Sequence, residues 1–323
     1  MVIVLVEIAD GAPVGVGLEL INGAKAIAKG EKVTALVLGE GVEAAAKTAI
    51  EYGADDAIIV DGAQYADYNS DVYACAVAKV IDEAKPAVVL MGATALGKDL
   101  VPRVAAKVGA GCVCDATGLA VNEAGEVVYT VPAFSGNILT DVVLSTPIQI
   151  ASVRGGSIPK AEPEAGKAGD IAKKDIAVAA EDIKIQVKEA IKEISESVNL
   201  EEAEVIVAGG RGMGNADNFN QLQELADVFG GVVGCTRPAM EAGWVTRAHQ
   251  VGQSGKIVAP KLYIAFGISG ATQHVSGMIG SKYIVAINKD EDAPIFEVAD
   301  VGIVGNCMDV LPVMLEEIKK RKA

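Results

Sequence analysis

The first half of the chain alternates between short apolar runs and longer amphipathic segments. The apolar runs VIVLVE, KVTALVLG, DDAIIVDG and AVVLMGA occupy residues 2–7, 32–39, 55–62 and 87–93. Such runs, rich in β-branched residues, predict strands that are buried on both faces of a sheet. The segments between them predict helices, the third of which has Ser70 or Asp71 as its N-cap and Pro86 beyond its end. Four β-α units in a row predict a parallel sheet with right-handed crossovers.

The pattern changes between Cys112 and Val153, where short β-rich pieces are separated by turns. Residues 122–125 predict a hairpin turn, so we expect an antiparallel extension of the first domain. Residues 155–175, rich in glycine, proline, lysine and alanine, predict a loop. Residues 183–194 (IKIQVKEAIKEI) alternate in polarity and predict a strand that returns to the sheet.

A second α/β pattern follows the polar segment 195–204. The buried runs EVIVAGG, LYIAFGI, YIVAINKD and VGIVG predict strands, and NFNQLQELADVFG, GATQHVSGMIG and the last 17 residues predict helices, the first of them ending at Gly230. We therefore expect an α/β protein of two domains with mainly parallel sheets. Residues 1–200 would form an N-terminal α/β domain, and residues 201–323 a second α/β domain.

Composition narrows the classes of function. The formal net charge of −15 disfavours nucleic-acid binding, because an acidic surface repels phosphate backbones. Five scattered cysteines do not form a disulfide framework, and the pair Cys112 and Cys114 predicts two alternating strand positions rather than a metal site. The start of the chain lacks the basic region of a signal peptide, and no apolar run has the length of a membrane span. We expect a cytoplasmic protein without a metal.

Reactive side chains concentrate in the second domain. Both histidines, the single tryptophan and four of the six arginines lie there. The segment AGGRGMG follows a strand and precedes a helix, as a phosphate-binding loop does, but it fails the G-x-G-x-x-G spacing, and no G-x-x-x-x-G-K-[ST] motif occurs. The glycine-rich turn is as consistent with a structural role as with an anion site, and Arg211 within it favours contact with a pyrophosphate. Taken alone, His274 favours a satisfied, partly buried histidine over a ligand contact.

Four segments of the second domain resemble a known family. GGRG, TRPAMEAGW, VGQSGKIVAPKLYIAFGISGATQH and AINKDEDAPIFEVADVGIVG, in this order and spacing, are similar to the FAD domain of the electron-transfer flavoprotein alpha subunit. The first domain is similar, through weaker motifs, to that family's nucleotide-hydrolase-like N-terminal fold. The resemblance implies FAD as the cofactor, with the first domain serving as scaffold and partner surface.

The resemblance also implies roles for individual residues. Arg211 would contact the diphosphate, Arg237 would lie against the isoalloxazine ring, and the hydroxyl of Ser254 would approach its N5 atom. His274 would donate to the ring near N1 and the C2 oxygen, where with Arg237 it would stabilise negative charge. Asn306 stands where many relatives carry aspartate at the adenosine end. The expected FAD-binding set is Arg211, Thr236, Arg237, Val251, Gly252, Gln253, Ser254, Ser269, Gly270, Ala271, Thr272, Gln273, His274, Asn288, Asn306 and Cys307.

The function that follows is that of an electron carrier rather than an enzyme acting alone. The chain would pair with the family's beta subunit and pass single electrons to or from an acyl-CoA dehydrogenase. In some anaerobic relatives the beta subunit holds a second FAD that oxidises NADH, so the resemblance leaves simple transfer and electron bifurcation open. The alternatives are an NAD-dependent oxidoreductase and a non-redox protein that binds adenine nucleotide.

Overall fold

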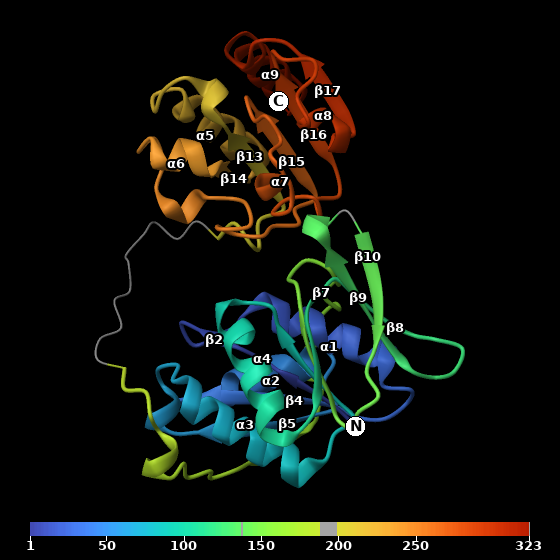
Figure 1. The fold of residues 1–323 in the computed structure, drawn as a ribbon. Helices are drawn as coiled ribbons and strands as arrows, with labels where there is room; N and C mark the ends of the chain where they lie inside the picture. The colour runs from blue at the N-terminus through green and yellow to red at the C-terminus, as the bar shows by residue number, and fades with distance from the viewer. Residues whose placement is uncertain (137, 188–198, 323) are drawn as a thin grey trace. The chain divides into compact units, whose positions relative to one another are not determined.

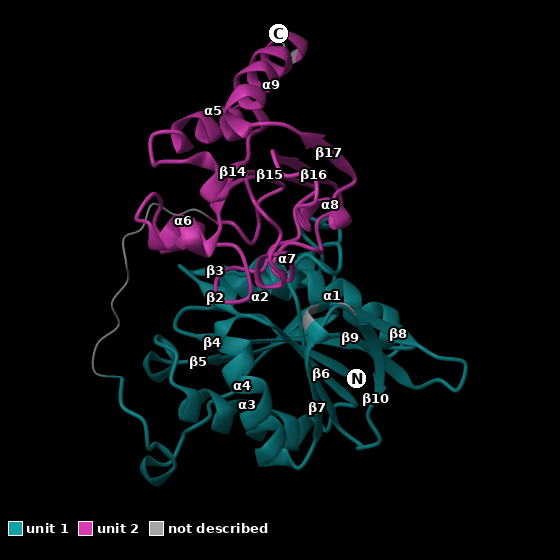
Figure 2. Cartoon of the chain, turned by 45° about the horizontal axis from the view of Figure 1, so that its top comes forward, with its two compact units in different colours: residues 1–192 teal, residues 193–323 magenta. Residues whose placement is uncertain are grey.

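The computed structural model describes residues 1–136, 138–187 and 199–322, and Figure 1 shows their course. The chain forms two compact units, residues 1–192 and residues 193–323, which Figure 2 colours separately. Both units are built on a sheet of parallel strands. The predicted α/β class with mainly parallel sheets is confirmed, whereas the predicted boundary between residues 200 and 201 stays a prediction.

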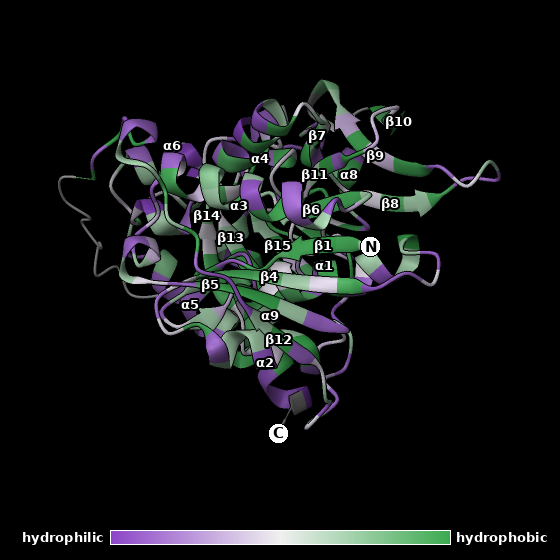
Figure 3. Cartoon of the chain, turned by 90° about the horizontal axis from the view of Figure 1, so that it is seen from below, coloured by the Kyte–Doolittle hydropathy of each residue, from purple (hydrophilic) through white to green (hydrophobic). Residues whose placement is uncertain are grey.

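The first unit is built on a seven-stranded sheet with the order β12-β5-β4-β1-β6-β11-β7, and every neighbouring pair is parallel. Its strands are β1 (Val2–Leu5), β4 (Val33–Gly39), β5 (Asp56–Asp61), β6 (Val88–Gly92), β7 (Gly111–Ala116), β11 (Gln149–Val153) and β12 (Asp170–Lys173). The four apolar runs at the start of the chain form β1, β4, β5 and β6, as their composition predicts. Figure 3 shows β1 hydrophobic along its length, which fits a strand buried on both faces.

Four helices follow the first strands of this sheet: α1 (Gly15–Ile27), α2 (Glu43–Glu51), α3 (Ser70–Ala84) and α4 (Ala95–Val108). Two hydrophobic clusters lie on its two faces, one with α1 and α2 and the other with α3 and α4. The N-cap of α3 is Asn69, whose side chain accepts from the N–H groups of Asp71 and Val72. The prediction of Ser70 or Asp71 was therefore one or two residues late.

The stretch from Cys112 to Val153 is antiparallel only in part. Strands β8 (Gly118–Val121), β9 (Val127–Ala133) and β10 (Ile138–Val143) form a separate three-stranded antiparallel sheet. The hairpin turn predicted at residues 122–125 joins β8 to β9 and is confirmed. The first and last strands of the stretch, β7 and β11, instead join the main sheet in parallel. A small hairpin, β2 (Ile8–Ala9) and β3 (Ala12–Pro13), precedes α1.

The strand that returns to the edge of the main sheet is not the predicted one. Strand β12 lies within the predicted loop and pairs with β5. Residues 183–187 form no strand, because the N–H groups of Lys184 and Ile185 bind the carboxylate of Asp71 at the start of α3. Residues 188–194 of the prediction lie outside the described residues. Alternating polarity was therefore a misleading signal here.

The second unit is a five-stranded parallel sheet with the order β14-β13-β15-β16-β17. Its strands are β13 (Val205–Gly209), β14 (Val232–Cys235), β15 (Leu262–Phe266), β16 (Ile284–Asn288) and β17 (Val301–Val304). Its helices are α5 (Phe219–Phe229), α6 (Arg237–Glu241), α7 (Thr272–Val275), α8 (Ile295–Val298) and α9 (Cys307–Lys322). The chain leaves β13 toward β14 on one side and returns to β15 on the other. Ligands of such sheets bind at this switch point, outside the carboxyl ends of the strands.

Two helix predictions in this unit have different outcomes. Helix α5 ends where Gly230 adopts a left-handed conformation with φ of 68°, as predicted. The segment GATQHVSGMIG forms a single helical turn over residues 272–275 and continues in turns. Within the described residues, no helix combines the length and apolar character needed to cross a membrane.

Candidate functional site

Three glycines bring the backbone together at the switch point. The N–H of Gly210 donates to the carbonyl of Phe266, and the N–H of Gly212 donates to the carbonyl of Gly267. A Cβ atom on Gly210 would lie 2.4 Å from the carbonyl oxygen of Gly267, which leaves no room for a side chain. Gly267 also has a φ of 61°, in the left-handed region that favours glycine. The loops after β13 and β15 therefore depend on bare backbone at this contact.

The loop formed by residues 250–256 is fixed to the same edge from two sides. The N–H of Val251 donates to the carbonyl of Cys235 at the end of β14, and the N–H of Gln253 donates to the carbonyl of Gln273 at 2.7 Å. Gly252 has a φ of 139°, and a Cβ atom there would lie 2.9 Å from the carbonyl oxygen of Gln273. Two segments about twenty residues apart in sequence thus form one surface.

His274 is a buried titratable group of this surface, with 7% of its area exposed. Its Nδ1 atom lies 3.0 Å from the carbonyl oxygen of Val251, and its Nε2 atom lies 3.0 Å from the hydroxyl of Tyr263. A carbonyl only accepts, so Nδ1 carries the proton, and Nε2 accepts from the Tyr263 hydroxyl. Burial lowers the pKa of His274 to about 4, although the bond to Val251 raises it slightly. The imidazole is therefore neutral at pH 7.

Tyr263 is the partner that the sequence reasoning missed. It is the second residue of β15 and is fully buried, and its ring centroid lies 6.1 Å from that of His274. Its burial raises its pKa well above the usual value, so the hydroxyl stays protonated. The available signal was one hydroxyl in the otherwise apolar run LYIAF, since a buried tyrosine O–H requires a partner.

Thr236 carries an unsatisfied polar atom. The residue is 7% exposed, and its Oγ1 atom has no hydrogen-bond partner among the described residues. It lies between the end of β14 and the first residue of α6. A buried hydroxyl without a partner costs about 1–3 kcal/mol of stability. Such an atom is expected where a bound molecule supplies the missing partner.

Two arginines that follow strands of this edge are exposed, Arg211 and Arg237, and Arg247 is exposed in the segment that leads to the loop of residues 250–256. Arg237 donates from Nε to the carboxylate of Glu241 at 2.7 Å, and 63% of its side chain is accessible. The side chain of Arg211 has no hydrogen-bond or ion-pair partner in the described part of the chain. Their guanidinium groups can therefore bind an anion without first breaking a strong internal pair, except for the exposed pair at Glu241.

The three residues expected at the adenosine end make contacts within the protein. The amide of Asn288 donates to the carbonyl of Ile268 at 2.9 Å and accepts from the N–H of Asp290. The side chain of Asn306 accepts from the N–H of Met308 at the start of α9. The thiol of Cys307 contacts the carbonyl of Gly212 at 3.1 Å. In this structure these side chains hold the surrounding loops in place, with Asn306 exposed and the other two buried.

The structure brings the expected residues to one edge of the sheet. Arg211 follows β13, Thr236 and Arg237 follow β14, and residues 269–274 follow β15. Residues 251–254 join them through the bonds to Cys235 and Gln273, and Ser254 also accepts from the Gln250 amide. Asn288 ends β16, and Asn306 and Cys307 begin α9 after β17.

The residues at this edge fit a dinucleotide with a diphosphate. Exposed arginines supply positive charge, and a buried threonine hydroxyl has no partner among the described residues. Gln253, Ser269 and Gln273 add exposed polar side chains. This donor set is suited to phosphate oxygens and to the polar edge of a heterocycle. Which of the sixteen residues contact the cofactor stays a prediction.

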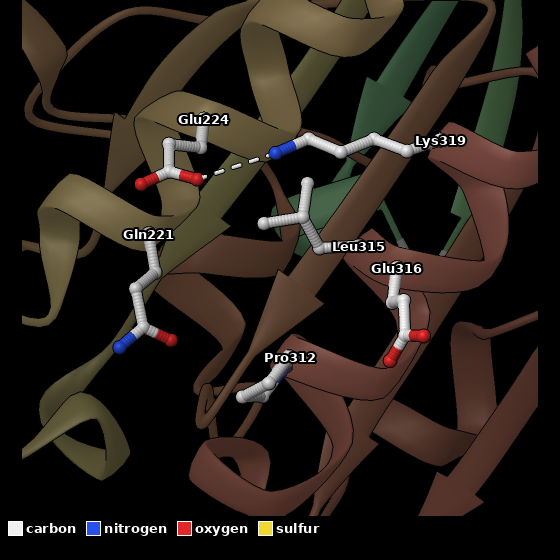
Figure 4. A pocket seen from close by; sticks show the side chains of 6 residues that line it. All are labelled: Gln221, Glu224, Pro312, Leu315, Glu316 and Lys319. Carbon is white, nitrogen blue, oxygen red and sulfur yellow. Dashed lines mark hydrogen bonds and ion pairs between the residues drawn. The ribbon is translucent and has the colours of Figure 1, made fainter. Parts of the chain in front are cut away.

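A separate hollow of about 430 Å³ lies between α5 and α9. Figure 4 shows Gln221 and Glu224 on one side and Pro312, Leu315, Glu316 and Lys319 on the other, with an ion pair joining Glu224 to Lys319. None of the expected cofactor residues lines it. We regard it as a groove between two surface helices rather than as part of the site.

Comparison with known proteins covers both units. Residues 2–179 match the electron transfer flavoprotein domain, and residues 199–279 match the electron transfer flavoprotein FAD-binding domain. The alpha subunit of the electron transfer flavoprotein from Thermoanaerobacterium thermosaccharolyticum is 45% identical over 99% of this chain and 98% of that protein. The alpha subunit from Bacillus subtilis is 41% identical, with 99% and 97% covered. The acryloyl-CoA reductase electron transfer subunit beta of Anaerotignum propionicum is 37% identical, with 99% and 95% covered.

Proposed function

Because the chain belongs to the electron transfer flavoprotein alpha-subunit family, we propose that it exchanges single electrons between FAD and an acyl-CoA dehydrogenase. Its role as an electron-transfer flavoprotein subunit, its use of FAD and its pairing with a beta subunit follow from the family. The dehydrogenase is the finer part of the proposal. It is supported by a full-length relative that is named as an electron transfer subunit of acryloyl-CoA reductase. Acryloyl-CoA is a CoA thioester.

We assign the FAD to the carboxyl edge of the second sheet. The unpartnered hydroxyl of Thr236 is the observation that carries this assignment. Arg211 would bind the diphosphate, since its guanidinium group is exposed and unpaired among the described residues. The loop of residues 251–254 and the segment 269–274 would enclose the ring and its ribityl chain.

FAD supplies the one-electron chemistry, and the protein supplies binding and electrostatics. In this arrangement Arg211 and Arg237 provide positive charge, whereas His274 is neutral and its proton points at Val251. For His274 to donate to the cofactor, Nε2 would have to carry the proton and give up its bond to Tyr263. We therefore propose that the arginines carry most of the electrostatic stabilisation and that His274 mainly shapes the pocket.

The experiment that tests the proposal uses the heterodimer with the beta subunit. A short-chain acyl-CoA and its dehydrogenase are added to the heterodimer without oxygen. The FAD of this chain should become reduced, and the rate of its reduction should be proportional to the heterodimer concentration. Arg211→Met should weaken FAD binding, and added salt should weaken it less in the variant than in the native protein. A heterodimer that binds FAD but accepts no electrons from any acyl-CoA dehydrogenase would overturn the choice of redox partner.

The same heterodimer distinguishes simple transfer from bifurcation. A second FAD in the beta subunit that NADH reduces would favour bifurcation, whereas AMP bound there would favour simple carriage. The measurement is the FAD content per heterodimer, followed by NADH titration. The predicted cytoplasmic location stays a prediction.

A further inference from the structure

Two cysteines of the first unit lie together on its surface. Cys112 and Cys114 are exposed, whereas Cys75, Cys235 and Cys307 are buried. Both belong to β7, which lies at the edge of the seven-stranded sheet. Residues two apart in a strand project from the same face. Val113 between them is buried on the opposite face, in the cluster with α1 and α2.

The strand is irregular at the second cysteine. Val113 pairs with Ala151 and Ala116 pairs with Val153, so two residues of β7, Cys114 and Asp115, stand opposite the single Ser152 of β11. Asp115 has a φ of 64°, which is uncommon for a residue with a side chain. A bulge of this kind turns side chains out of the regular pleat and locally increases the twist.

Polar contacts hold this bulge in place. The N–H of Asp115 donates to the hydroxyl of Ser152 at 2.9 Å. The carboxylate of Asp115 accepts two bonds from the guanidinium of Arg154, at 2.8 and 2.6 Å. The backbone on the C-terminal side of Cys114 is therefore fixed, two residues along the strand from Cys112.

We propose that Cys112 and Cys114 form a dithiol that closes to a reversible disulfide by exchange with a low-molecular-weight disulfide. Two residues along a strand separate their Cα atoms by about 6.6 Å, near the upper end of the range that a disulfide spans, roughly 4.4–6.8 Å. A bridge at the end of that range is strained and easily reduced, as labile and regulatory disulfides are. Among the described residues no third histidine, cysteine or carboxylate completes a metal site with them.

The exchange conserves atoms and electrons with the low-molecular-weight disulfide as the only added reactant. The thiolate of one cysteine attacks the low-molecular-weight disulfide RSSR, which forms a mixed disulfide and releases one thiol. The second thiolate then attacks the protein sulfur of the mixed disulfide, closes the bridge and releases the other thiol. Two electrons pass from the dithiol to RSSR, and the two thiol protons end on the two molecules of RSH.

The surroundings of Cys114 suit it to the second step. The part of its thiol that lies within the protein and the neighbouring Cys112 thiol raise the pKa of Cys114, so less of it is thiolate at neutral pH. We assign the first attack to Cys112 and the resolving step to Cys114. The proposal does not depend on the flavin site, because it rests on β7 and β11 of the first unit alone.

The test uses the heterodimer, reduced and then exposed to oxidised glutathione without oxygen. Intact-mass spectrometry should show this chain two hydrogen atoms lighter and without bound glutathione, and peptide mapping should place the bridge between Cys112 and Cys114. Cys114→Ser should retain one glutathione on Cys112, and Cys75→Ala, a buried control outside both sites, should close as the native chain does. Dithiothreitol should reverse the closure.

Three results would overturn the proposal: two bound glutathiones on the native chain, no reaction at either cysteine, or a bridge to another chain. A second measurement avoids substitutions altogether. Phenylarsine oxide, which bridges two neighbouring thiols, should protect both cysteines of the native chain from alkylation. Alkylation of both sulfurs at the untreated rate would show that the thiols do not act together.

Discussion

The two parallel sheets of this protein expose different chemistry at their carboxyl edges. In the first unit carboxylates occupy that edge. Asp61 accepts from the N–H of Gly41 at 2.8 Å, and Glu7 accepts from the hydroxyl of Thr94, which also caps α4. In the second unit the corresponding edge carries Arg211, Arg237 and an unsatisfied threonine hydroxyl.

The difference teaches that a parallel sheet supplies the position of a site but not its ligand. Both edges offer loops at the ends of buried strands, where ligands of such folds bind. At the first edge the protein's own carboxylates already take up donors that a phosphate would need, and they repel anions. At the second edge, the guanidinium groups of Arg211 and Arg237 and the hydroxyl of Thr236 remain for a dinucleotide.

The largest effect should come from the glycine contact at the second edge. Gly267→Ala should lower the free energy of unfolding of the second unit by about 2–4 kcal/mol, from left-handed strain and from a Cβ atom placed 2.6 Å from Gly212. The measurement is urea unfolding followed by the fluorescence of Trp244, the only tryptophan of the chain, which packs near Phe219 in this unit. Gly230→Ala is the control, since it has a similar φ but open space around it. Equal losses in the two variants would show that the close approach is unimportant.

His274 should make the second unit sensitive to pH in a way that the first unit, which has no histidine, is not. Its pKa is lowered from 6.5 to about 4 on folding. The contribution of His274 to the free energy of unfolding is therefore present above pH 6.5. It is lost as the pH falls toward 4, because the unfolded chain binds the proton first. The stability difference between the native chain and His274→Asn should shrink by about 2–3 kcal/mol from about pH 7.5 to about pH 4.5. A difference that does not change with pH would contradict the neutral imidazole.

Substitution of Thr236 should change the stability of the chain and its affinity for FAD in opposite directions. Thr236→Val should raise the stability of the FAD-free chain by about 1 kcal/mol, because it removes a buried hydroxyl that lacks a partner. The same change should weaken FAD binding by roughly tenfold, which equals about 1.4 kcal/mol. Thermal unfolding and fluorescence titration with FAD measure the two effects, and Thr236→Ser, which keeps the hydroxyl, should retain affinity. Unchanged affinity in the valine variant would remove Thr236 from the site.

The smallest effect should come from the carboxylate edge of the first unit. Glu7→Gln should change stability by less than about 1 kcal/mol, since the glutamine oxygen can still accept from Thr94. FAD binding should be unchanged, as measured by the same titration. A loss of FAD affinity in this variant would mean that the two edges are not independent, and the comparison would fail.

The loops of the candidate site were easier to predict than their internal contacts. The glycine and arginine of AGGRGMG and the cluster around GISGATQH stand out in the sequence, and all lie at the carboxyl edge. The bond of His274 to Tyr263 was missed, because the hydroxyl in the apolar run LYIAF signals that a partner exists but not which residue it is. The Asn288 side chain links the end of β16 to the loop after β15, and its expected contact with the adenosine stays a prediction.

The sequence by itself determined the α/β class, most strands and helices, and the concentration of ligand chemistry in the second half, since these follow from local periodicity and residue type. Only the tertiary structure decided which strand closes the edge of the first sheet and which buried hydroxyl has no partner. Those outcomes depend on pairings between residues far apart in sequence. Competition among such pairings, as when Asp71 binds the backbone of residues 184 and 185, leaves no trace in a local pattern.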